Sequence, residues 1–215
     1  MSDANTTTVR SVWMGTIFGT AALVFYLARS FLPLPNLVAT YCYLLFGPCL
    51  VLAFFGWWPF MERGGAILRA RVATVFGIIA GATNMMFAVV QMNNLYYLRL
   101  KIAAAENEAL VGEWKRILVG VLTVQNGLNF TMDFFLDAAA FCYASILWRQ
   151  GMSGRALALL SVLLVGPHFF MKLGTFPEPP AEAGLFDGGP LVGLWFLLTT
   201  LYVSRWCWQQ RHANA

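Results

Sequence analysis

The chain has 215 residues, of which 59% are hydrophobic and only 11% carry a charged side chain. A soluble domain carries roughly a quarter charged residues, and a chain this short could not hide so much apolar surface from water. We therefore predict a polytopic, all-α integral membrane protein built as a single transmembrane domain. The net charge of +4 comes from scattered basic residues rather than from a patch, which argues against nucleic acid as a partner.

Six stretches have the length and apolar character of transmembrane helices, which need about 20 residues to cross a bilayer. The prolines of LPLPN close the first hairpin, because proline cannot continue a helix. The charged link at 99–116 favours helix, so the two spans that it joins are expected to project beyond the bilayer. The predicted spans are 11–32, 37–58, 71–97, 117–148, 155–173 and 190–208.

Two pairs of glycines lie four residues apart within predicted spans. They are Gly15 with Gly19 and Gly77 with Gly81. Such a pair lets a neighbouring helix backbone approach closely, but glycine is common in transmembrane helices, so chance explains each pair equally well. The sequence leaves the two explanations open.

Lysine and arginine indicate the orientation, because cytoplasmic loops carry an excess of both. With the N-terminus inside, eight arginines fall on the inner side and six basic residues on the outer side. We predict both termini in the cytoplasm and a location in a bacterial plasma (inner) membrane. The outer residues are Arg29, Arg99, Lys101, Lys115, Arg116 and Lys172.

The fourth span carries polar side chains far from either of its ends, in the stretch QNGLNFTMDFFLDAAAFCYASILW. At about 100° per residue, four of them fall within roughly 80° on one helix face. A carboxylate in hydrocarbon costs several kcal/mol, so this face must point into the protein or into water. The four residues are Asn126, Asn129, Asp133 and Asp137.

Two other spans carry matching polar faces. Asn84 and Gln91 share a face of the third span, and Ser161, His168 and Lys172 share a face of the fifth. We expect a polar crevice that opens outward between the third, fourth and fifth spans, with the two aspartates at its floor.

Depth separates the residues of this crevice into two levels. Asp133 and Asp137 are expected near or below the midplane, whereas His168 and Lys172 fall in the outermost turns of their span. On this argument the two aspartates and the histidine form no metal site, and an Asp–Lys pair does not form unless the fourth helix is tilted or broken.

Each of these residues also has a purely structural explanation. The aspartates would be protonated and hydrogen-bonded to asparagine, and Lys172 would extend to the interface. His168 would pack between helices, and the amide side chains would hold helices together. The convergence of three polar faces favours a functional site, because ionisable residues inside a membrane are functional candidates by default.

The sequence contains no recognisable cofactor or catalytic motif. His168 is the only histidine before the C-terminal tail, which argues against haem as a cofactor. The sequence leaves other cofactors open. No phosphate-binding glycine loop, G-x-S-x-G elbow or H-E-x-x-H pair is present.

We therefore expect a proton- or cation-linked transporter or channel-like protein, in which the aspartates bind the proton or cation and the amide and histidine side chains bind substrate or relay protons. One alternative is a non-catalytic membrane subunit that docks a partner helix, a lipid or a pigment. The other is a lipid-modifying membrane enzyme whose acids do acid–base work. The expected partners are the lipid bilayer and either further copies of the chain or a larger membrane complex.

Overall fold

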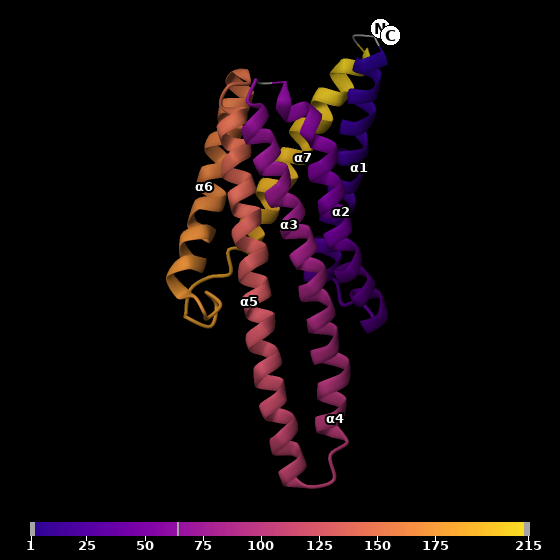
Figure 1. The fold of residues 1–215 in the computed structure, drawn as a ribbon, viewed down its shortest axis with the longest axis vertical. Helices are drawn as coiled ribbons and strands as arrows, with labels where there is room; N and C mark the ends of the chain where they lie inside the picture. The colour runs from indigo at the N-terminus through magenta and orange to yellow at the C-terminus, as the bar shows by residue number, and fades with distance from the viewer. Residues whose placement is uncertain (1–2, 64, 213–215) are drawn as a thin grey trace.

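The computed structural model describes residues 3–63 and 65–212, and within them all regular structure is helical. Six of these helices are long and apolar enough to cross a membrane, which confirms the predicted all-α, six-span fold class. The two ends of the described chain lie at the same end of the bundle (Figure 1). The six helices are α1 (Asp3–Phe31), α2 (Asn36–Glu62), α3 (Ile67–Met92), α5 (Glu108–Leu147), α6 (Gly151–Thr175) and α7 (Gly189–His212).

These six helices form a closed ring. Each one packs against the next in the chain, and α7 returns to pack against α1. The ring arises because every span is apolar enough to face lipid on one side, while small and polar residues turn inward. Polar side chains on different helices therefore face a common centre.

The hairpin of α3 and α5 is much longer than the other helices. α3 continues without a break through the π-helical turn η1 (Asn93–Leu98) into α4 (Arg99–Ala103). This hairpin reaches far past the other helices at the end opposite the termini (Figure 1). The 40 residues of α5 rise about 60 Å, twice the roughly 30 Å of a bilayer core, so the hairpin exceeds a bilayer crossing as the sequence predicts.

The glycine pairs in α1 and α3 are true contact faces. A Cβ added to Gly15 would lie 2.8 Å from a backbone carbon of Gly56, and one added to Gly77 would overlap the ring of Phe54. At Gly15 two backbones meet and both sides are glycine, whereas at Gly77 the absence of a side chain makes room for the Phe54 ring. The question that the sequence left open is therefore settled in favour of packing.

The half of the ring nearer the termini is filled by aromatic side chains. Phe54 and Tyr143 stack with their ring centres 5.5 Å apart, and Phe196 lies 5.1 Å from Trp57 by the same measure. Phe54, Trp57 and Tyr143 are fully buried. This aromatic cluster (Phe54, Trp57, Tyr143 and Phe196) closes the centre of the ring at that end.

Candidate functional site

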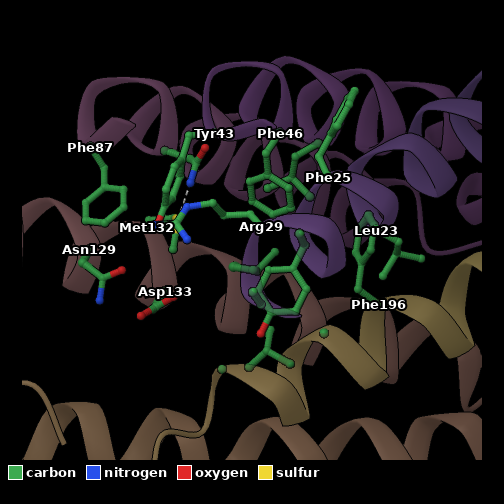
Figure 2. Close-up of a pocket in the computed structure, with 18 of the residues that line it drawn as sticks. Leu23, Phe25, Arg29, Tyr43, Phe46, Phe87, Asn129, Met132, Asp133 and Phe196 are labelled. Atoms are coloured by element: carbon green, nitrogen blue, oxygen red, sulfur yellow. Dashed lines mark hydrogen bonds between the residues drawn. The ribbon is translucent and has the colours of Figure 1, made fainter. Parts of the chain in front are cut away.

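A cavity of about 310 Å³ lies at the centre of the ring, on the side of the aromatic cluster away from the termini (Figure 2). All six long helices contribute to its wall. The third, fourth and fifth spans all line this cavity as predicted, but the predicted crevice is incomplete, because closure of α7 on α1 brings three further helices to the same centre. The polar and charged residues that line this central cavity are Tyr26, Arg29, Ser30, Tyr43, Asn84, Asn129, Asp133, His168, Lys172 and Asp187.

Four ionisable side chains from α5 and α6 lie in a continuous row, which we call the ionisable chain. Lys172 Nζ lies 2.6 Å from Asp133 Oδ2, and the same oxygen lies 3.8 Å from His168 Nε2. On the other side of the imidazole, His168 Nδ1 lies 2.7 Å from Asp137 Oδ2. One histidine therefore stands between two carboxylates, and one of these is also paired with a lysine.

The expectation that His168 lies too far outward to meet the aspartates is wrong. The first turn of α6 extends past the end of α5, so that a Cβ on Gly154 would meet the Leu147 carbonyl oxygen at 2.5 Å. Leu147 and Gly154 therefore lie at the same level. Asp137 is ten residues from Leu147 and His168 fourteen residues from Gly154, which puts them about 15 and 21 Å from that level at ~1.5 Å per residue. Side chains lean toward the N-terminus of their own helix, so in this antiparallel pair the two lean toward each other.

The exclusion of an Asp–Lys pair is wrong for the same reason. Lys172 is one helical turn beyond His168, and Asp133 is one turn beyond Asp137 in the same direction away from the α5–α6 connection, so the two again lie at one level. Their side chains are both 12% exposed, so Lys172 turns into the protein instead of extending to the interface. Desolvating both charges is costly, and the short contact offsets part of that cost.

The inner end of the ionisable chain is sealed from the central cavity. Asp137 is fully buried, His168 is 1% exposed, and Asp137 does not line the cavity. Within the part of the chain that the structure describes, Asp137 Oδ1 has no hydrogen-bond partner. A buried carboxyl oxygen without a hydrogen-bond partner costs free energy. The other oxygen of this carboxyl group, Oδ2, is hydrogen-bonded to His168. The His168 imidazole, which lines the cavity, is thus in contact with a carboxyl group that does not line it.

The predicted amide residues separate into different places. Asn129 lines the central cavity, and Asn84 reaches it while its Nδ2 donates to Met132 Sδ at 3.1 Å. Gln91 instead lines a second cavity of about 230 Å³ beside the α1–α2 connection. Asn126 is half-buried and lines neither of these two cavities.

The predicted residues do not form a three-residue metal site. No group of three or more His, Cys, Asp or Glu residues that could hold a metal ion occurs among residues 3–63 and 65–212. His168 directs its two ring nitrogens to two different carboxylates, whereas a shared metal would need one nitrogen and both carboxylates facing one point.

Sequence reasoning missed Arg29, Tyr43 and Asp187 as cavity residues. The guanidinium carbon of Arg29 lies 4.4 Å from the centre of the Tyr43 ring. Arg29 looks interfacial in the sequence because it stands near the end of its span. The available signal was the spacing of Tyr26, Arg29 and Ser30 at i, i+3 and i+4, which places them on one face of α1.

The two cavities meet at Arg29 and Tyr43, since both residues line both cavities. In Figure 2 the Arg29 side chain extends from α1 across the central cavity, with Tyr43 beside it and Asn129 and Asp133 on the facing wall. The Arg29–Tyr43 pair thus separates the ionisable chain from the cavity nearer the α1–α2 connection.

The site therefore combines a small cavity with a row of ionisable groups that leads from its wall into the protein. No protein-family model matches this chain, and no curated protein or solved structure is similar to it. A fold alone does not establish an activity. The geometry of the site carries the functional argument.

Proposed function

We propose that this protein is a proton-linked membrane transporter in which the ionisable chain binds and passes on the proton. The observation that supports this most is the contact sequence Lys172–Asp133–His168–Asp137 beside a central cavity. Ionisable groups inside a membrane are expensive to keep and mark proton and ion paths. Histidine suits the middle position, because it can take a proton on one ring nitrogen and release one from the other.

The distances suggest the order of events. A proton that reaches Asp133 from the cavity removes the charge that holds Lys172, so that this short ion pair loosens. The 3.8 Å between Asp133 Oδ2 and His168 Nε2 exceeds hydrogen-bonding distance, so transfer there requires a side-chain movement or a bridging water. The 2.7 Å contact from His168 to Asp137 needs no such movement. Proton transfer between Asp133 and His168 is therefore the step that a conformational change can control.

The aromatic cluster supports transport by alternating access. It closes the ring on the side of the termini, while the central cavity lies on the other side. In this conformation a solute enters from the end opposite the termini, and its release requires the cluster to separate. Protonation of the ionisable chain would shift the balance between the two conformations, since it changes the charge at the centre of the ring.

The orientation belongs to the same proposal. Two of the six basic residues assigned to the outer side, Arg29 and Lys172, line the cavity and do not count as loop residues. The comparison then becomes eight basic residues inside against four outside, which favours cytoplasmic termini. With this orientation, in a bacterial plasma membrane, the cavity would lie toward the exterior.

Proton flux in liposomes tests the proposal. The purified protein is reconstituted around a trapped pH-sensitive dye, the membrane potential is clamped with potassium and valinomycin, and a panel of small organic acids, amines and sugars is added outside. We expect Asp133→Asn to lower solute-dependent proton flux at least tenfold, because the first proton acceptor is lost. Glu113→Gln, an exposed acid on the projecting hairpin, is the control and should match the wild type. Flux equal to that of empty liposomes with every solute would refute the proposal.

A further inference from the structure

Arg29 is a cation inside the ring without an acidic partner. In the region of the chain covered by the structure, its guanidinium makes no ion pair or hydrogen bond, and its Nε is buried without an acceptor. The Tyr43 ring 4.4 Å away offers a cation–π contact, but this leaves the N–H donors unused. A buried guanidinium N–H without an acceptor is costly to retain unless something binds it.

The acids around the central cavity are already engaged. Asp133 is paired with Lys172 at 2.6 Å, and Asp187 Oδ1 accepts a hydrogen bond from the Gly189 backbone amide at 2.9 Å. Arg29 is therefore the cation left over at the cavity wall. A guanidinium presents its donors in a planar fork that matches a carboxylate, which makes an organic acid the natural complement.

Beside its polar residues, the cavity wall has an apolar part suited to a hydrophobic group. Aliphatic and aromatic side chains surround the space next to Arg29, and Phe25, Phe46, Phe87 and Phe196 are among those seen in Figure 2. A volume of about 310 Å³ is at the small end of ligand pockets, which span roughly 300–1,000 Å³. This combination selects a small acid with one carboxylate and a compact hydrophobic group.

We propose that the central cavity binds a small apolar monocarboxylate, with its carboxylate held by Arg29 and its hydrophobic group against the phenylalanines. This inference rests on the proposed function, because the bound acid would be the solute that moves with the proton. A proton on Asp133 removes a negative charge that faces the bound carboxylate, so proton and acid bind together. The acid passes Arg29 on its way in, because this residue also lines the second cavity.

Equilibrium binding to the full-length protein in nanodiscs tests the inference. The probes are radiolabelled benzoate and isovalerate, with benzamide and isovaleramide as uncharged matches of the same shape. We expect the acids to bind at least tenfold more tightly than their amides, since the amides cannot pair with Arg29. Equal binding of acid and amide, or no binding of either acid, would overturn the inference even without a protein variant.

Substitutions at Arg29 give the second arm. Arg29→Gln is expected to weaken benzoate binding at least tenfold, and Arg29→Lys to restore part of it through charge without the planar fork. Arg99→Gln, an exposed arginine on the projecting hairpin, should bind as the wild type does. Benzoate binding that is unchanged in Arg29→Gln would place the acid elsewhere and reject the proposed site.

A third arm separates a free acid from one supplied by the bilayer. Oleate carries the same carboxylate on a chain too long for the cavity, so it should fail to displace benzoate at equal concentration. Displacement by oleate would overturn the assignment to a small acid. The inference and the proposed function also fail separately. Benzoate binding without any proton flux would refute only the proposed transport. Proton flux that is sensitive to Asp133→Asn, without benzoate binding, would refute only the assignment of the solute as a small acid.

Discussion

The two halves of the helical ring differ in how densely their centre is packed. Toward the termini, Gly15 and Gly56 bring two backbones into contact, and the aromatic cluster fills the centre. Away from the termini, the same helices separate around a cavity of about 310 Å³ that carries Arg29 and the Lys172–Asp133 pair on its wall. Dense packing and buried charge thus occupy different levels of one bundle.

The difference shows how a small membrane protein keeps a charged cavity open. A cavity gives up dispersion contacts, and a buried ion pair pays for desolvation, so both act against stability where they occur. The tightly packed half contains neither the central cavity nor the Lys172–Asp133 ion pair, and its contacts hold the six helices together. Substitutions in the packed half should therefore act mainly on stability, and substitutions in the cavity half mainly on function.

Breaking the backbone contact should have the largest effect. Gly56→Leu places a side chain against the backbone of Gly15, where a Cβ alone already overlaps, so the helices must separate. We expect a loss of at least about 4 kcal/mol in unfolding free energy, at the extreme for single substitutions. The readout is the yield of monodisperse protein and its thermal midpoint. Gly120→Leu, with no atom within 4 Å of its Cβ position, is the matched control and should behave as the wild type.

Truncating one phenylalanine in each half sharpens the comparison, because Phe54 and Phe46 lie on the same helix. Phe54 is fully buried in the aromatic cluster, whereas Phe46 lines the cavity and is half-buried. Phe54→Ala should cost about 3–5 kcal/mol, and Phe46→Ala about 1 kcal/mol, since less contact is lost there. Thermal unfolding of the two variants in the same lipid compares them directly, and equal losses would contradict the division into a packed half and an open half.

Removing one partner of the ion pair on the cavity wall should cost less stability than removing Gly56 or the Phe54 ring. Lys172→Met leaves Asp133 without its partner, and we expect a loss of about 2 kcal/mol in unfolding free energy. The double variant Asp133→Asn, Lys172→Met removes both charges and should recover most of that loss. A double variant as unstable as the sum of the two single ones would mean that the two side chains do not interact as the 2.6 Å contact indicates.

Sequence periodicity was sufficient for the fold and for part of the site. Long apolar stretches predicted all six helices, and helical spacing placed Asp133 and Asp137 on the inward face of α5. The register between α5 and α6 was out of reach, because it depends on how far α6 begins beyond Trp148. That offset follows from the turn at Gly151, whose φ of 77° favours glycine. A register is a property of the loop conformation, which hydropathy does not encode.

Arg29 was missed for a different reason. Whether an arginine near a helix end faces the headgroups or the protein depends on which helices surround it, and here α7 closes the ring next to α1. Gly56 was missed likewise, since its partner Gly15 is on another helix and the spacing between them follows no local pattern. Long-range neighbours of this kind become visible only in three dimensions.

The long α3–α5 hairpin is a lever arm, because a small tilt of α5 gives a larger displacement at its far end. Asp133 lies 25 residues from Glu108 at the start of α5, or about 37 Å along a single continuous helix. A tilt of about 5° at the level of the ionisable chain therefore moves the start of α5 by roughly 3 Å. In the proposed transport cycle, a tilt of α5 on protonation would therefore be largest at the hairpin tip, where a spectroscopic probe could follow it.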